Sequence, residues 1–268
     1  MILVSHPPVR APAGYPRQGP DHAIHGEAAA KLQCRACLQV AQCLPGALQA
    51  DEVQQFERSV QRCRPLAAHE HLFRAGDTFR SIFAIQSGSC KTYMVDNTGR
   101  EHVISFYFAG EILGMDAIYA GRHPSSCVAL SNSRICVLSY PTLTSLAAGM
   151  PDLQLQMLRL FSREILGNSA LAGDFSADER LATFLVMVAA RQKDQGSTDL
   201  ELAMTRQDIA NYLRLAPETL SRILARFQKK GLIRSSRRLI TLLDVDGLAE
   251  LAACMNPYAR CNSQRQDR

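Results

Sequence analysis

Residues 205–231 read TRQDIANYLRLAPETLSRILARFQKKG, which contains two short helical patterns separated by a tight turn. Thr205 and Asp208 stand three residues apart, the spacing of a capping box, so a helix is expected to begin there. Pro217 suits the first position of a second helix, and Gly231 suits the residue that ends it. The stretch therefore predicts a helix-turn-helix.

The second of these helices has an apolar face and a polar face. Glu218, Ser221 and Arg222 fall opposite the apolar residues, which recur at helical spacing (Leu220, Ile223, Leu224 and Phe227). An arginine can donate two hydrogen bonds to guanine, a glutamate can accept one from cytosine, and a serine can touch a base edge. We expect these three side chains to read base pairs in the major groove and Lys229 to contact phosphate.

Positive charge is concentrated around this helix. Eight basic residues and one acidic residue lie between positions 214 and 238, whereas the whole chain carries a net charge of +5. Such a basic stretch is the electrostatic footprint expected of a DNA-binding surface. Thr205, Arg206 and Arg214 are further expected DNA contacts, and the basic hairpin at 234–241 suggests a winged variant. The alternative is a solvated basic helix that binds no nucleic acid.

Upstream of this stretch, the apolar period from Pro151 to about Phe175 is helical. The residues of one stripe are spaced three and four apart, as in a coiled coil: Leu158, Phe161, Ile165, Asn168 and Ala172. This seam predicts a dimerisation helix over 151–175, in a homodimer; the alternative is a helix packed only on its own domain. Ser176 and Glu179 form a capping box for a new helix.

Short apolar runs alternate with turn signals between Leu66 and Tyr140. The turns are expected at 74–77, 86–89, 96–99 and 108–111, each of which contains a glycine. Repeated strands with close turns predict an antiparallel barrel or jelly roll. Residues 51–63 read as a short amphipathic helix, and residues 1–30 as a flexible arm.

Three of the nine cysteines, Cys34, Cys37 and Cys43, follow a C-x2-C-x5-C spacing. One backbone loop can direct such thiolates at a single centre, and a metal or an iron–sulfur cluster is the usual occupant. The sequence shows no secretory signal pattern and no apolar run long enough to cross a bilayer. We therefore expect no membrane association and a cytoplasmic protein, in which thiols stay reduced.

Several stretches resemble one family: residues 72–77 (LFRAGD), 84–88 (AIQSG), 108–111 (FAGE) and 204–209 (MTRQDI). They are similar to the FNR (fumarate and nitrate reduction regulator) branch of the cyclic-AMP receptor protein superfamily of bacterial transcription regulators. The most specific stretch is residues 218–222 (ETLSR), which resembles the E-x-x-S-R recognition signature of that branch. The resemblance runs from about Cys34 to Ala252.

The resemblance implies an α+β fold with an N-terminal β-roll sensor domain of the cyclic-nucleotide-binding, jelly-roll type. A long dimerisation helix and a C-terminal winged helix-turn-helix follow. It also implies an oxygen-responsive regulator that binds double-stranded DNA at a TTGAT-type inverted repeat and contacts RNA polymerase. On this basis we divide the chain into an arm (1–30), an iron–sulfur sensor region with β-roll (31–150), a dimerisation helix (151–175), a DNA-binding domain (176–255) and a flexible tail (256–268).

The resemblance further implies a [4Fe–4S] cluster held by the three N-terminal cysteines and one distant cysteine, which maps onto Cys136. Cys127 is the nearest competitor for that position. The other cysteines, Cys63 among them, are expected to be packing or bystander thiols. At the positions aligned with the cyclic-AMP contacts stand Met115 and Pro124-Ser125, without the glutamate and arginine, so no cyclic AMP binding is expected.

Two alternatives to the cluster-dependent regulator stay open. The same fold could respond through thiol oxidation or a zinc ion, and an iron–sulfur enzyme is a more distant possibility. Against an enzyme, the chain lacks the C-x3-C-x2-C spacing of radical enzymes, a glycine-rich nucleotide loop and a nucleophile elbow. Relatives of the branch carry an acid where Asn168 stands, and its repulsion disfavours the cluster-free dimer. We expect this chain's cluster-free form to dimerise more readily.

Overall fold

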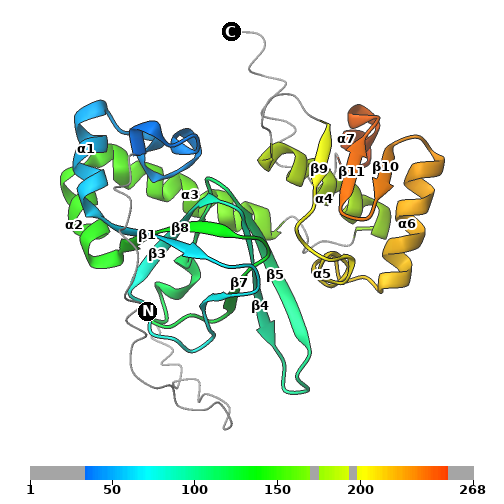
Figure 1. Ribbon diagram of the computed structural model, residues 1–268, viewed down its shortest axis with the longest axis horizontal. Helices are drawn as coiled ribbons and strands as arrows, with labels where there is room; N and C mark the ends of the chain where they lie inside the picture. The colour runs from blue at the N-terminus through cyan, green and yellow to red at the C-terminus, as the bar shows by residue number, and fades with distance from the viewer. Residues whose placement is uncertain (1–33, 170–174, 193–197, 253–268) are drawn as a thin grey trace, which may run out of the picture.

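The computed structural model of the protein describes residues 34–169, 175–192 and 198–252. The expected arm, the expected tail and Ala172 of the expected seam lie outside the described residues. Figure 1 shows one half built around β-strands and another half that is mostly helical. No helix in the described part of the chain is long and apolar enough to cross a membrane. The predicted α+β class is confirmed.

The first half is a β-roll made of two four-stranded antiparallel sheets. One sheet has the order β1 (Val60–Leu66), β8 (Ser133–Ser139), β3 (Ser81–Ser87), β6 (Ile112–Leu113). The other has the order β2 (His71–Phe73), β7 (Ser126–Ala129), β4 (Ser89–Val95), β5 (Glu101–Phe108). Apolar side chains from both sheets, such as Leu66, Ile85 and Ile135, pack between them. Burial of these inward-facing residues is what holds the sheets together.

The four expected turns fall where the strands reverse, and each glycine has a positive φ between 82° and 89°. Gly88, between β3 and β4, is the most constrained of them. A Cβ atom at this position would lie 2.2 Å from the Oγ of Ser133, too close for any side chain. The positive φ and the tight contact together explain why the turn needs glycine.

The helix expected over 51–63 is shorter than predicted. Helix α1 covers Ala50–Ser59, with Val53 and Phe56 on its buried face, and β1 begins at Val60. Residues from Val60 to Leu66 pair with β8, and these cross-strand hydrogen bonds override the amphipathic pattern of the sequence. As a consequence Cys63 lies in a strand, opposite Cys136.

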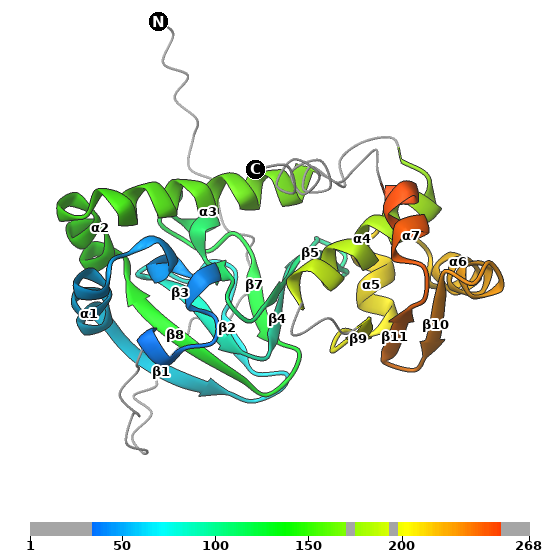
Figure 2. The same cartoon turned by 90° about the horizontal axis from the view of Figure 1, so that it is seen from above.

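Helices α2 (Tyr140–Gly149) and α3 (Pro151–Ser169) follow the roll, and α3 runs along its side (Figure 2). Leu153 and Leu160 of α3 are buried against the roll. On another side of α3, Leu158 is 59% and Ile165 66% exposed, and Phe161 is half-buried. The helix therefore packs on its own domain and also presents the apolar residues of the expected seam to solvent. Of Asn168 only the backbone is described, within α3.

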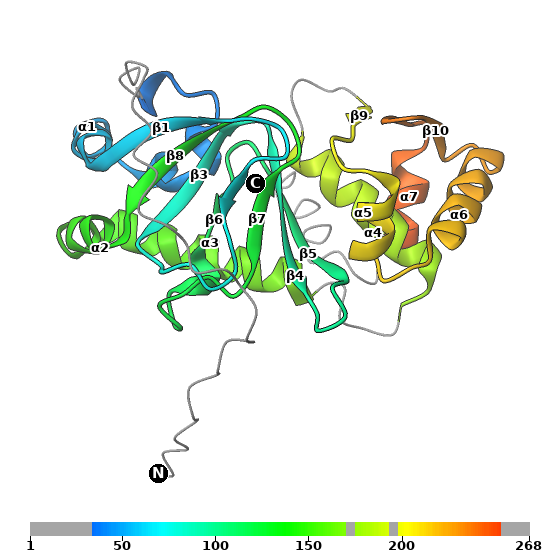
Figure 3. The same cartoon turned by 60° about the horizontal axis from the view of Figure 1, so that its bottom comes forward.

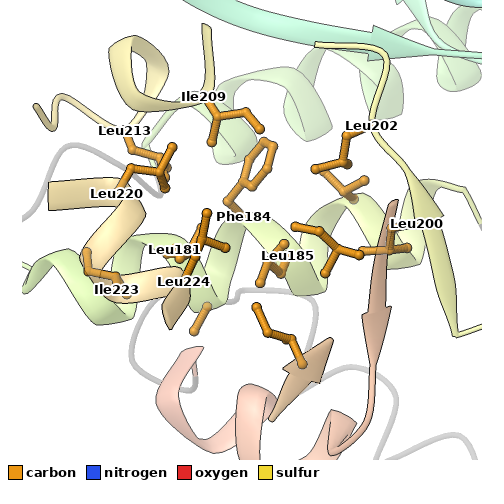
Figure 4. Packing of buried hydrophobic residues seen from close by; sticks show 14 of the residues in the cluster. Leu181, Phe184, Leu185, Leu200, Leu202, Ile209, Leu213, Leu220, Ile223 and Leu224 are labelled. Carbon is orange, nitrogen blue, oxygen red and sulfur yellow. The ribbon is translucent and has the colours of Figure 1, made fainter. Parts of the chain in front are cut away.

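The second half is a winged helix-turn-helix. It contains α4 (Ala177–Arg191), β9 (Asp199–Glu201), α5 (Arg206–Tyr212), α6 (Pro217–Lys229), β10 (Ile233–Ser236), β11 (Leu239–Leu242) and α7 (Val245–Ala252). Ser176 caps α4 and Thr205 caps α5, each through the expected capping box. Figure 4 shows Phe184 of α4 among leucine and isoleucine side chains of the neighbouring elements. This apolar core fixes α6 against α4 and α5.

Strand β5 of the roll also belongs to this core. Phe106 of β5 packs edge-on against Phe184 and Tyr212, with ring centroids 6.0 and 5.0 Å away. Figure 3 shows β4 and β5 next to α4 and α5. The two halves therefore share an apolar interface.

Candidate metal centre and nucleic-acid interface

The cysteine-rich segment is a series of short 3₁₀ turns: η1 (Cys34–Ala36), η2 (Val40–Gln42) and η3 (Leu44–Ala47). Backbone N–H groups of residues 37, 40 and 43 donate to the carbonyls three positions earlier, at 3.0–3.2 Å. Side chains three residues apart lie one above the other in such turns. The C-x2-C-x5-C spacing therefore places Cys34, Cys37 and Cys43 on one side of the segment.

These three cysteines and Cys136 of β8 line one pocket. Most of the other lining side chains are apolar, among them Val40, Phe56 and Leu138. The segment thus lies over the sheet formed by β1, β8 and β3, with its cysteines turned toward Cys136. Cys127 does not line this pocket; it lies fully buried between the sheets.

Burial controls the ionisation of these thiols. Burial, and to a smaller extent the neighbouring Cys43, raise the pKa of Cys34 to about 12. Burial likewise raises the pKa of Cys43 to about 12, although the backbone N–H of Leu44 acts in the opposite direction. Near neutral pH both thiols keep their protons unless a positively charged group enters the pocket.

As placed, the four thiols do not surround a single metal ion. Four thiolates on one zinc ion would lie about 3.8 Å apart, from a Zn–S distance of about 2.3 Å. Within the described ranges, no three potential ligands lie close enough together to hold one metal ion. A [4Fe–4S] cluster takes each thiolate on a different iron, so its ligands stand farther apart.

The pocket is also narrow. Its volume of about 30 Å³ has room for about two water molecules. A [4Fe–4S] cluster is larger than this volume, so the pocket as it stands does not enclose one.

Several polar contacts attach the cysteine segment to the surrounding helices. Gln156 of α3 donates from Nε2 to the carbonyl oxygen of Cys43 at 3.2 Å. The backbone N–H of Arg35 donates to Glu57 of α1 at 3.0 Å, and the Arg35 side chain donates to the carbonyl of Ala50. The bond from Gln156 joins the pocket directly to the helix that carries the expected seam.

Near the positions aligned with cyclic-AMP contacts, side chains contact one another. Ser125 donates to Asp116 at 3.3 Å. The ring of His123 stacks on Phe73 with a centroid distance of 3.8 Å. The expectation that cyclic AMP does not bind stays a prediction.

Helix α6 presents the expected polar face to solvent. Glu218, Ser221, Arg222 and Lys229 are exposed, whereas the residues of the apolar face are buried. Ser221 donates its hydroxyl to the carbonyl of Pro217 at 2.9 Å. The helix lies at the outer edge of its half of the molecule, where a groove of DNA can reach it (Figure 1).

The other expected DNA contacts have different surroundings. Arg214 is exposed in the turn between α5 and α6, with φ +55°. Thr205 is exposed, but its hydroxyl bonds Asp208 within the cap. Arg206 donates to Ser235 at 2.7 Å and to the Arg237 carbonyl at 3.1 Å, so it joins α5 to the wing.

One basic residue of the 214–238 stretch has a partner outside the stretch. Arg226 donates to Asp178 in the first turn of α4, with a distance of 3.0 Å from Nε. Its charge is therefore partly neutralised within the protein.

A polar link between the halves was not predicted from the sequence. Lys91 of β4 pairs with Asp208 of α5 at 2.6 Å and with Glu101 at 3.0 Å. Burial lowers the pKa of Lys91, but its hydrogen bonds with these carboxylates outweigh that effect and raise it. Asn211 of α5 bonds the backbone of β5 at Glu101 and Val103. The partners from the two halves, Lys91 with Asp208 and β5 with Asn211, lie more than 100 positions apart in the chain, so no local pattern identifies them.

Comparison with protein families matches both halves of the chain. The family model of the Crp-like helix-turn-helix domain matches residues 179–251, and that of the cyclic nucleotide-binding domain matches residues 63–149. The fumarate and nitrate reduction regulatory protein of Escherichia coli strain K12 is 39% identical over 226 residues, covering 82% of this chain and 90% of that protein. The protein of the same name from Shigella dysenteriae is also 39% identical over the same lengths.

Solved structures share the fold. FixK2 from Bradyrhizobium japonicum aligns with a TM-score of 0.64 and 22% identity, covering 70% of this chain and 96% of that one. A CooA mutant from Carboxydothermus hydrogenoformans aligns with a TM-score of 0.58 and 21% identity, covering 71% of this chain and 87% of that one.

Proposed function

The chain belongs to the FNR branch of the cyclic-AMP receptor protein superfamily, whose members regulate transcription, and we propose that it responds to oxygen through a [4Fe–4S] cluster. When oxygen is low, the cluster-loaded protein is a homodimer that binds a TTGAT-type inverted repeat. Loss of the cluster in air lowers its affinity for DNA. The protein acts in the cytoplasm, with RNA polymerase as its partner at promoters, and without catalysing a reaction.

The observation that carries this proposal is the pocket lined by Cys34, Cys37, Cys43 and Cys136. Four thiolates complete the ligand set of a [4Fe–4S] cluster. Bound there, the cluster would supply oxygen-sensitive redox chemistry and the positive charge that keeps the buried thiols ionised. The sensitivity to oxygen itself rests on the kinship with the FNR branch.

Contacts of the cysteine segment suggest how the pocket influences dimerisation. Gln156 holds the Cys43 carbonyl from α3, so a shift of the segment changes how α3 lies on the roll. Farther along α3, Glu164 accepts a 2.7 Å hydrogen bond from Tyr107 of β5. The exposed Leu158 and Ile165, with Phe161 and Asn168, then pair with the same residues of a second copy.

Dimerisation supplies the geometry that DNA binding needs. Two copies of α6 that enter successive major grooves stand about 34 Å apart, one turn of DNA. Glu218, Ser221 and Arg222 read bases there, while Arg214 and Lys229 contact phosphates. Thr205 and Arg206, at the start of α5, approach the backbone beside the wing.

Anaerobic purification tests the proposal. We expect a brown protein that contains iron and acid-labile sulfide, bleaches in air, and binds an inverted-repeat duplex more tightly before air exposure than after. Cys136→Ala should prevent cluster assembly and abolish the response to air. Cys127→Ala is the matched control, because this buried thiol of the same domain does not line the pocket.

Other outcomes overturn the proposal. A colourless protein that contains zinc, or one that lacks both iron and sulfide yet responds to oxidants, places the function with the zinc or thiol alternatives. A duplex affinity that is the same in wild type and Cys136→Ala, with iron present in both, removes Cys136 from the ligand set.

A further inference from the structure

The β-roll contains two pairs of neighbouring cysteines in addition to the N-terminal cysteines. Cys63 of β1 and Cys136 of β8 lie on paired strands, and so do Cys90 of β4 and Cys127 of β7. All four side chains are buried. Burial and strand pairing therefore do not distinguish the two pairs, but the register of the strands does.

The strand register makes one pair suitable for a disulfide and the other unsuitable. Cys63 of β1 stands directly opposite Cys136 of β8. Directly opposed residues have Cα atoms about 4.5–5.5 Å apart, within the range of about 4.4–6.8 Å that a disulfide needs.

Cys90 of β4 and Cys127 of β7 are instead diagonal neighbours. Cys90 stands opposite Ala129, and Cys127 stands opposite Thr92. Diagonal neighbours are about 7–8 Å apart, beyond the limit of about 7 Å for bridging without backbone movement. The chain thus supplies its own matched control.

We propose that Cys63 and Cys136 form an oxidation site in which the two thiols join as a cross-strand disulfide in the cluster-free protein. The proposed function makes Cys136 a cluster ligand, and the next step rests on that assignment. The disulfide and the cluster then exclude each other. The same sulfur cannot be a thiolate ligand and half of a disulfide. Oxidation of the pair then blocks renewed cluster assembly until a thiol reductant restores Cys136.

The co-reactant is a small hydroperoxide such as hydrogen peroxide. One thiolate attacks the O–O bond and becomes a sulfenic acid as hydroxide leaves, and the second thiolate attacks that sulfur and displaces a second hydroxide. The two sulfurs lose two electrons to the peroxide oxygens, and two thiols and one peroxide give one disulfide and two waters.

The surroundings of Cys63 give the oxidant a route. Its thiol donates to Oε1 of Gln86 at 3.1 Å, and Gln86 lines the same pocket as Cys136. Cys63 and Cys136 are each 8% exposed, whereas Cys90 and Cys127 are completely enclosed. Access therefore favours the same pair as the strand register.

The test treats cluster-free protein with hydrogen peroxide, blocks the remaining thiols, and maps tryptic peptides without reduction. Cys63 lies in residues 63–74 and Cys136 in residues 135–159, while Cys90 and Cys127 lie in residues 81–91 and 123–134. We expect a cross-linked species of the first two peptides that disappears on reduction. It should be absent from Cys63→Ser and present in Cys90→Ser.

Three results overturn the inference: Cys136 stays reduced, Cys136 pairs with Cys34, Cys37 or Cys43 instead, or the Cys90–Cys127 bridge forms as readily. Because the map is made on cluster-free protein, it is read independently of the proposed function. A protein that never assembles a cluster but forms the Cys63–Cys136 bridge refutes the cluster and supports the oxidation site.

Discussion

The helix-turn-helix and the thiol pocket are built in opposite ways. The first lies within residues 205–231 and is held by an apolar core that is complete without a ligand. The second joins the 34–47 segment to Cys136, which stands 93 positions after Cys43. Burial raises the pKa values of Cys34 and Cys43, and the neighbouring cysteines do not lower them. The helix-turn-helix is therefore preformed, whereas the proposed sensing role of the thiol pocket requires a bound cluster.

Substitution of two core phenylalanines is the strongest test of this difference between the two regions. Phe227→Ala in α6 and Phe56→Ala beside the thiol pocket each remove a side chain that is at most 2% exposed, at a cost of about 3–5 kcal/mol. Phe227→Ala should lower DNA affinity and the stability of the helical half but keep iron uptake. Phe56→Ala should lower iron uptake and the stability of the β-roll half but keep the fold of the helical half. Urea unfolding and iron content measure both, and loss of iron in both variants would show that the halves do not fold independently.

Two arginines of α6 test whether this helix recognises individual bases. Arg222→Ala removes an exposed side chain expected to bind guanine and should weaken binding by about 1–3 kcal/mol, mostly at one base position. Arg226→Ala is the matched control, because Arg226 is bonded to Asp178. Fluorescence anisotropy with wild-type and substituted half-sites measures both. An equal loss for both variants on every duplex would mean that charge alone, without base reading, governs affinity.

Two glutamines of α3 test the link between the regions. Gln156→Ala removes the bond to the Cys43 carbonyl, worth about 0.5–1.5 kcal/mol. We expect unchanged iron content and a roughly two- to tenfold smaller difference in DNA affinity between the cluster-loaded and cluster-free forms. Gln154→Ala, on the exposed side of the same helix, should leave that difference intact. Identical behaviour of the two variants would remove Gln156 from the link.

The smallest effect is expected at Asn168. Asn168→Asp places two like charges across the expected dimer seam and should weaken the cluster-free dimer by about 1 kcal/mol or less at low salt. Sedimentation equilibrium of the cluster-free protein measures the change, which should fade as salt screens the charges. A strictly monomeric wild-type protein at micromolar concentration would contradict the expectation that this form dimerises readily.

Local patterns in the sequence predicted the elements whose signals lie within a few residues. The caps at Ser176 and Thr205 and the four glycine turns of the roll fall where they were expected. The helix expected over 51–63 was wrong at its end, since pairing with β8 is a long-range interaction that its own residues do not encode.

Local interactions along the sequence determined the helix-turn-helix, the turns and the spacing of Cys34, Cys37 and Cys43. Helix caps, left-handed glycines and helical periods act over only three to four residues. Only the tertiary structure places Cys136 in one pocket with those cysteines and sets Cys63 opposite Cys136. It also forms the ion pair between Lys91 of the roll and Asp208 of α5. These contacts depend on strand register and on the packing of distant segments, which only the complete hydrophobic core establishes.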